Sequence, residues 1–217
     1  IARGIDFNFF DPNNVKAQQV ELIIKEFNID YDAIKILLAG RITGWKGHKL
    51  LLQAISSIIK KTNHKFEIIF VGPDENYKLK NLLINFANEH NLSKSLHFVG
   101  PRNDLNNFYS LADLVISAST DPEAFGRISV EAQAMGKPIV ASNIGGSKET
   151  IINKKTGFLY KHDDPRELAK ILNTVIQLSP DELKSIGNEG RKNITKKFDV
   201  ETMCQSNLKE YKRLIKN

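Results

Sequence analysis

The sequence has 217 residues, which is enough for one large α/β domain with a full core or for two small domains; one domain is the simpler interpretation. Hydrophobic residues make up 41% of the chain and charged residues 26%, so the composition excludes disordered and fibrous proteins. The net charge is +6, but the 31 basic residues are spread along the whole chain, which argues against a nucleic-acid-binding protein.

Other compositional features concern the compartment. The single cysteine, Cys204, favours neither a disulfide framework nor a thiol metal site, which fits a reducing, cytoplasmic location. No apolar run approaches the ~18 residues that a membrane span needs, and no signal peptide is evident.

The start at Ile1 rather than Met suggests a fragment. The basic excess has two explanations, a compositional bias toward Lys, Asn and Ile or a basic face toward an anionic donor or lipid.

Six short apolar runs alternate with longer amphipathic stretches. The alternation predicts an α/β fold with a Rossmann-like, doubly wound parallel sheet of about six strands, helices on both faces and extra C-terminal helices over residues 164–217. Asp164 with Pro165, Pro180 and Asp199 mark the starts of those last helices. The predicted strands are Ile34–Ala39, Phe66–Val71, Ser95–Val99, Leu114–Ser117, Pro138–Ala141 and Gly157–Leu159.

The turns that follow the first five strands should lie on one rim, because parallel strands end at the same edge of a sheet, where such folds bind ligands. After the first strand, Gly40 and Arg41 precede Lys46 and Gly47 at the head of an amphipathic helix. Two cations and free backbone N–H groups suit a phosphate. The segment GRITGWKG matches neither the dinucleotide fingerprint nor a P-loop, and taken alone it also fits an ordinary turn.

Glu123 and Glu131 flank the next informative turn, in EAFGRISVE. Phe125 and Gly126 should open a helix, which places Glu131 about one turn inside it and Glu123 in the preceding loop. Each carboxylate alone is explained as a solvated surface charge. Together, beside a phosphate-binding turn, they favour hydroxyl recognition and hence a sugar diphosphate ligand.

No metal site is predicted. The five histidines lack metal-ligand spacing, and each is expected at the surface or at a helix end: His48, His64, His90, His97 and His162. Trp45, within the phosphate turn, is either a lid over the ligand or a hydrophobic prop; the prop is favoured.

Nearly the whole chain resembles the C-terminal, donor-binding domain of the retaining glycosyltransferases with the two-domain GT-B architecture, the glycosyltransferase group 1 family. The resemblance rests on motifs in a fixed order. They are Gly40-Arg41 with Lys46-Gly47, GPRNDLNNFYSLADLVISAS, Glu123 and Glu131 separated by seven residues, Gly136-Lys137-Pro138, Gly145-Gly146 with Glu149, and Thr156-Gly157.

The resemblance implies roles for the motif residues. Arg41 and Lys46 match the cations that neutralise the donor diphosphate without a metal ion, Glu131 matches the acid that binds ribose, and Glu123 matches the acid facing the donor sugar. Arg41, Lys46 and Glu123 are thus the candidate catalytic residues. The remaining candidate donor-binding residues are Gly40, Val99, Arg102, Phe125, Gly126, Arg127 and Ile128. The amides of residues 125–127 would contact sugar hydroxyls, and Ile128 would lie near the phosphates. The turn at Val99–Arg102 matches the region beside the base, on which Arg102 can stack.

Arg127 departs from the family pattern, in which this position is more often uncharged. Its side chain either enters the cleft and reads an acidic donor sugar, or points away so that only its amide matters. The resemblance implies a UDP-, GDP- or ADP-sugar as substrate and no cofactor. The base, the sugar and the acceptor stay open.

The single domain is expected to span 1–217, with 1–12 leading in from an N-terminal acceptor domain that these residues do not include. The final helix, Val200–Lys216, either packs toward that domain or closes this core. The expected function is transfer of a hexosyl group to a lipid-linked or cell-envelope acceptor such as lipopolysaccharide, with peripheral contact at the inner membrane face left open. Two alternatives are an epimerase or phosphorylase on the same fold and a non-catalytic nucleotide-binding scaffold.

Overall fold

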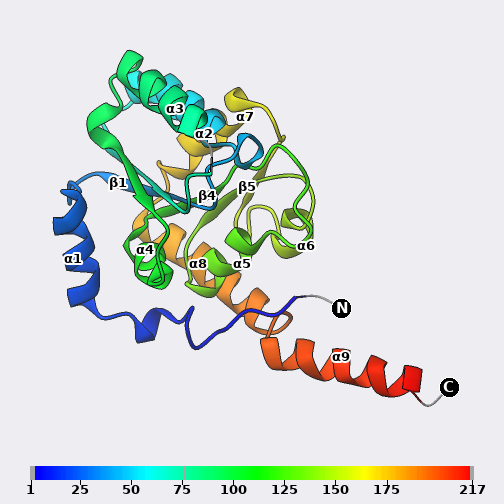
Figure 1. Cartoon of the computed structure of the whole chain (residues 1–217). Coiled ribbons are helices and arrows are strands. Elements are labelled where there is room, and N and C mark those ends of the chain that lie inside the picture. The colour runs from blue at the N-terminus through cyan, green and yellow to red at the C-terminus, as the bar shows by residue number, and fades with distance from the viewer. Residues whose placement is uncertain (1–2, 76, 216–217) are drawn as a thin grey trace.

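The structure is a computed structural model that describes residues 3–75 and 77–215. Six parallel strands form one sheet in the order β3-β2-β1-β4-β5-β6 (Figure 1). The order reverses between β1 and β4, which is the switch point at which sheets of this kind bind ligands. The strands are β1 (Ile34–Ala39), β2 (Phe66–Val71), β3 (Leu96–Gly100), β4 (Leu114–Ser117), β5 (Ile139–Ser142) and β6 (Phe158–Tyr160).

The predicted doubly wound sheet is confirmed, and three strands have the predicted bounds. The other three both start and end one residue later than predicted, and local features accompany each later start. Ser95 ends a short 3-10 turn before β3. Pro138 has no N–H for a strand ladder, although its carbonyl accepts a hydrogen bond from Val115 at 3.0 Å. Gly157, before β6, has a φ of +158°.

Helices cover both faces of the sheet, and each face has its own apolar core. Leu51 and Leu172 belong to the first core, and Phe108 and Ile194 to the second. The helices on the first face are α2 (His48–Ile58), α3 (Tyr77–Glu89) and α7 (Pro165–Val175). Those on the second face are α1 (Ala17–Phe27), α4 (Leu105–Leu111), α5 (Arg127–Ala134) and α8 (Pro180–Thr195) (Figure 1). The short elements are α6 (Ser147–Thr150) and the 3-10 turns η1 (Pro12–Asn14), η2 (Gly44–Lys46), η3 (Ile59–Lys61) and η4 (Ser93–Ser95).

The C-terminal helices begin where the sequence predicts. The side chain of Asp164 accepts hydrogen bonds from the first backbone N–H groups of α7. Ser179 and Glu182 form a capping box at the start of α8. Asp199 accepts from the backbone N–H of Thr202 at 3.0 Å, at the start of α9 (Val200–Ile215).

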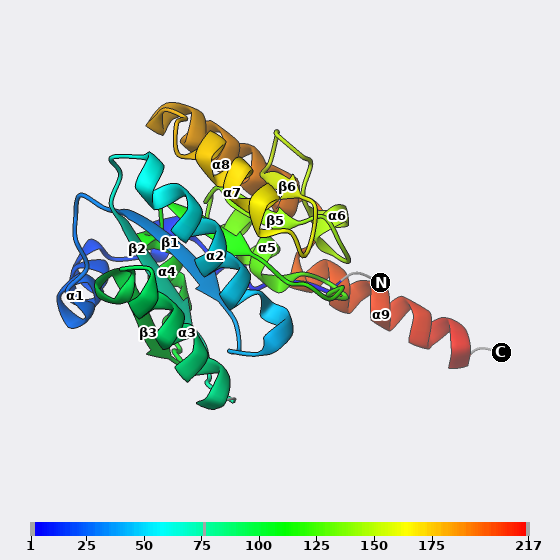
Figure 2. The same cartoon turned by 90° about the horizontal axis from the view of Figure 1, so that it is seen from above.

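Helix α9 extends away from the rest of the molecule (Figures 1 and 2), and no residue within Val200–Ile215 is buried. The chain start passes beside it, since the Ile5 N–H donates to the Phe198 carbonyl at 2.8 Å. The predicted end of the last helix, Lys216, lies outside the described residues, as do residues 1 and 2 of the leading segment. Within residues 3–75 and 77–215, no helix has the length and apolar character to cross a membrane.

Candidate functional site

A pocket of about 340 Å³ lies at the carboxyl ends of β1, β2 and β3, and we call it the carboxyl-edge pocket. The start of α5 closes its remaining side. Its lining includes seven predicted site residues, namely Gly40, Arg41, Lys46, Arg102, Arg127, Ile128 and Glu131. The other lining residues are Ala39, Trp45, Val71, Gly72, Pro73, Pro101 and Leu105. The fold therefore gathers residues from distant turns, as parallel strands should.

The turn after β1 combines cations with close backbone approaches. The Gly40 N–H donates to the Val71 carbonyl at 2.7 Å, which extends the β1–β2 pairing into the turn. Gly47 has a φ of +74°, and a Cβ there would lie 1.9 Å from the carbonyl oxygen of Ala118. Glycine at this position therefore lets the head of α2 lie directly against the end of β4. The Arg41 side chain is half exposed and pairs with Glu75 at 3.3 Å.

Lys46 and Glu123 form an ion pair between two turns that the sequence predicted separately. The Lys46 Nζ lies 2.8 Å from Glu123 Oε1, and only 11% and 14% of the two side chains is exposed. The Ser119 hydroxyl donates to the same oxygen. Trp45 lies under the ammonium, whose nitrogen is 4.4 Å from the ring centroid. Trp45 thus lines the pocket and supports Lys46, while its role as a lid over a ligand stays a prediction.

Glu131 is 4% exposed and both of its carboxylate oxygens are hydrogen-bonded. Oε2 accepts from the hydroxyl of Tyr109 at 2.8 Å. Oε1 accepts from Arg127 Nη2 at 2.8 Å and from Arg127 Nε at 3.1 Å. Burial raises the pKa of the Glu131 carboxyl, while the charge of Arg127 and the Tyr109 hydrogen bond act in the opposite direction. Tyr109 and Arg127 thus hold the Glu131 carboxylate in the lining of the pocket.

The start of α5 lies where the sequence places it. Gly126 adopts a φ of +72° and precedes the first helical residue, Arg127. Ile128 is buried at the pocket wall, where its Cδ1 would lie 3.6 Å from a Cβ added at Gly40. Phe125 faces away from the pocket lining and packs edge-on against Phe198, with ring centroids 5.5 Å apart.

Two predicted residues beside the base have other contacts. Val99 lies inside β3 and packs against the second core instead of lining the pocket. Arg102 does line the pocket, but its guanidinium forms two hydrogen bonds to Asp104, at 2.8 and 2.9 Å, and two to Glu26, at 3.0 and 3.4 Å. It also lies 5.3 Å from the centroid of the Phe108 ring. The stacking role of Arg102 stays a prediction.

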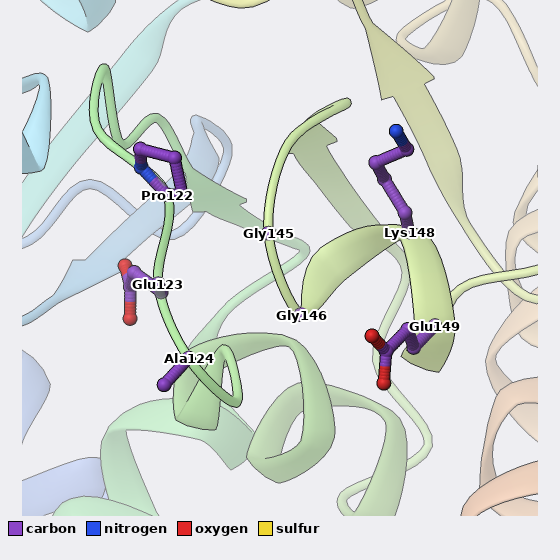
Figure 3. Close-up of a pocket in the computed structure, with 7 residues that line it drawn as sticks. All are labelled: Pro122, Glu123, Ala124, Gly145, Gly146, Lys148 and Glu149. Atoms are coloured by element: carbon purple, nitrogen blue, oxygen red, sulfur yellow. The ribbon is translucent and has the colours of Figure 1, made fainter.

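A second pocket, of about 510 Å³, borders the loop that carries Glu123, and we call it the loop pocket. Figure 3 shows that this loop forms one side and α6 the other, with the two glycines between them. A Cβ at Gly145 would lie 2.4 Å from the Glu123 carbonyl oxygen, so glycine permits this close approach. The lining residues are Pro122, Glu123, Ala124, Gly145, Gly146, Lys148 and Glu149.

Three site residues were missed by the sequence analysis. Tyr109 supports Glu131, Ser119 supports Glu123 and Glu75 pairs with Arg41. Tyr109 lies in an apolar helical pattern, which by itself indicates only a core position. His48 begins α2, as expected of a helix-end histidine, although its side chain is buried. The expectation is wrong for His97, which lies within β3 with its side chain only 11% exposed, beside Glu67. Among the described residues, no three His, Cys, Asp or Glu side chains are grouped to hold a metal ion.

Comparison with known proteins gives the family. Residues 19–193 match the family model described as glycosyl transferases group 1. A D-inositol 3-phosphate glycosyltransferase of Corynebacterium urealyticum is 30% identical over 181 residues, which cover 81% of this chain and 42% of that protein.

Solved structures are similar over nearly the whole chain. A glycosyltransferase from Rickettsia africae is 33% identical with a TM-score of 0.93, covering 99% of this chain and 56% of that one. Anabaena HepE in complex with UDP and glucose is 26% identical with a TM-score of 0.87, covering 97% of this chain and 55% of that one. The chain thus spans about half the length of these relatives. On the family match, it belongs to the group 1 glycosyltransferases, and its fold is one half of their GT-B architecture.

Proposed function

We propose that this chain is the donor-binding domain of a retaining glycosyltransferase that transfers a hexosyl group from a nucleotide diphosphate sugar to an acceptor. One observation carries the proposal. A basic turn after β1 and the buried carboxylate of Glu131 line the same pocket, at the switch point of the sheet. This pairing matches the two ends of a nucleoside diphosphate, with phosphates at the cations and ribose at the acid.

The proposed catalytic contribution is stabilisation of the leaving group. In the transfer, the bond between the anomeric carbon and the β-phosphate oxygen breaks, and the electron pair stays on that oxygen. Arg41 and Lys46 would neutralise the negative charge that builds there, together with N–H groups at the starts of α2 and α5. The new bond joins the anomeric carbon to an acceptor oxygen, whose proton leaves with the diphosphate. These two cations make a metal ion unnecessary in this proposal.

The sugar end of the donor is assigned to the loop before α5. Glu123 lies beside Lys46, and the loop that carries it also borders the loop pocket, across from α6 (Figure 3). Glu123 would therefore receive sugar hydroxyls next to the phosphates. The amides of Phe125, Gly126 and Arg127 would bind the remaining hydroxyls, and Arg102 would lie beside the base.

The donor is proposed to be a UDP-sugar, with GDP- and ADP-sugars as the other candidates. The support comes from HepE, which was crystallised with UDP and glucose and shares this fold. The acceptor, lipid-linked or part of a cell-envelope glycan, would bind to an N-terminal domain that faces this pocket. A cytoplasmic location, with peripheral contact at the inner membrane face, fits the net charge of +6.

Calorimetric titration without added metal tests the proposal. The chain is titrated with UDP, GDP and ADP and with hexose conjugates of each. Saturable binding of one nucleoside diphosphate is expected, and it should be lost in Glu131→Ala while the far-UV circular dichroism is unchanged. Equal binding by the parent and by Glu131→Ala would contradict the assigned site.

A further inference from the structure

The carboxylate of Glu131 is almost fully engaged by this chain's own residues. A carboxylate offers about four lone-pair sites. Arg127 takes two of them on Oε1 through Nη2 and Nε, and the Tyr109 hydroxyl takes one on Oε2. A vicinal diol donates two hydrogen bonds, so about one site is left for two donors. A ribose can therefore bind fully only if one of the existing partners gives way.

The two partners differ in their freedom to move. Tyr109 has no exposed surface and its ring packs edge-on against Phe10, with centroids 5.8 Å apart. Its hydroxyl cannot leave Glu131 without disturbing the core. The Arg127 side chain is 70% exposed, and the pair joins residues one turn apart on α5. The Glu131 end of this pair is buried, but the guanidinium end is solvated and stays in contact with water when it is released. Arg127 is therefore the partner that a ligand can displace.

A displaced Arg127 side chain has a second place to lie. Next to the carboxyl-edge pocket is a hollow of about 120 Å³ that Arg127 and Glu131 also line. The opposite side of this hollow is formed by the chain start and includes Asp6 and Phe10. The guanidinium can thus turn toward another carboxylate without crossing the core.

We propose that Arg127 is an internal competitor for the ribose diol. It occupies the diol-binding oxygen of Glu131 and exchanges with the ligand, which lowers the share of the binding affinity that the diol contributes. This inference rests on the proposed function, in which Glu131 binds ribose. Arg127 is thereby assigned a role in setting nucleotide affinity, which differs from reading an acidic sugar or contributing only its amide.

The test compares each of UDP, GDP and ADP with its 2′,3′-dideoxy counterpart by calorimetry at pH 8. The measured quantity is the Kd of the 2′,3′-dideoxy nucleotide divided by the Kd of the ordinary nucleotide, and we call it the diol ratio. Loss of the Arg127 charge changes the attraction for both diphosphates equally, so it cancels in the ratio. The diol ratio is expected to rise at least about twofold in Arg127→Met, because fully exposed helix pairs of this spacing set the lower bound and the Glu131 end of this pair is buried. Arg127→Lys should give an intermediate ratio.

Two further variants separate the possible failures. Arg166→Met removes an exposed arginine from the first turn of α7 and should leave the diol ratio unchanged. Glu131→Gln should lower the diol ratio toward 1, both in the parent chain and in the chain that carries Arg127→Met. If the parent chain binds none of the nucleotides, or has a diol ratio of 1, the proposed function fails and the inference with it. A parent ratio above 1 that depends on Glu131, but does not rise in Arg127→Met, overturns the inference alone.

Discussion

The Lys46 ammonium lies 2.8 Å from a carboxylate oxygen of Glu123, although the two residues are 77 positions apart in the chain. Lys46 follows β1 and Glu123 follows β4, and these strands are neighbours in the sheet. The pair spans the switch point and is largely shielded from water. A nucleoside diphosphate bound at this edge of the sheet would meet a lysine ammonium that Glu123 already holds in place.

Replacing Lys46 should weaken nucleotide binding strongly. Lys46→Met removes a shielded cation and leaves the Glu123 carboxylate facing the diphosphate, so we expect the Kd for the bound nucleoside diphosphate to rise about 10- to 100-fold, or about 1.4 to 2.8 kcal/mol. Lys49→Met is the matched control, because Lys49 is exposed on the first turn of α2. Calorimetry measures both. Equal losses in the two variants would show a general charge effect and contradict a specific contact.

Replacing Arg41 should weaken nucleotide binding and leave the free energy of unfolding nearly unchanged. The Arg41–Glu75 pair is about half exposed on each side, so Arg41→Ala should change the free energy of unfolding by no more than about 0.5 kcal/mol. Loss of its charged contacts to phosphate should raise the Kd about tenfold. Glu75→Gln, which frees Arg41, should bind at least as tightly as the parent. Parent-like affinity in Arg41→Ala would exclude it as a phosphate ligand.

Gly47 should tolerate no side chain, whereas Gly44 in the same turn should. A Cβ at Gly47 would lie 1.9 Å from the Ala118 carbonyl oxygen, and the φ of +74° is itself unfavourable for other residues. Gly47→Ala is expected to lower the free energy of unfolding by more than about 2 kcal/mol. A Cβ at Gly44 meets nothing within 4 Å, so Gly44→Ala should change it little. Similar urea midpoints for the two variants would contradict this packing.

The sequence predicts the sheet well because its strands are buried on both faces. All six residues of Phe66–Val71 are buried and all but Glu67 are apolar, so the bounds of this strand follow from composition. Asp164 could be predicted as a cap because its role depends only on the next three residues. The site residues Arg41, Lys46 and Glu131 were placed on one rim by strand direction alone.

The contacts between turns could not be predicted in the same way. Pairing of Lys46 with Glu123 depends on the order of β1 and β4 in space, which no local pattern encodes. The Tyr109 hydroxyl reaches Glu131 only because α4 and α5 share one face of the sheet. Arg102 was predicted to be available to a base, but nearby Asp104 already binds it. An Arg followed two residues later by Asp was the signal for that pair.

His48 should make the chain less stable in mild acid. Its side chain is 1% exposed, packs edge-on against Phe70, and has no hydrogen-bond partner for either ring nitrogen among the described residues. Burial, with the nearby Lys46 charge, lowers the pKa of His48 from 6.5 to about 3. Between these values the unfolded chain binds a proton that the folded chain does not, so stability falls as pH falls below 6.5. From pH 7 to pH 5 this loss amounts to about 2 kcal/mol.

Urea unfolding of His48→Leu at pH 7 and pH 5 measures this contribution. Leucine cannot take up the proton in the unfolded state, so the difference in unfolding free energy between the two pH values should be smaller than in the parent by about 2 kcal/mol. At pH 7 the variant should be at least as stable, because it buries no unpaired ring nitrogen. His162→Leu, at an exposed position, should keep the parent's pH dependence. If His48→Leu also kept the parent's pH dependence, the loss of stability in acid would not come from His48. The buried imidazole would then have to take up its proton in the folded chain, contrary to its packing against Phe70.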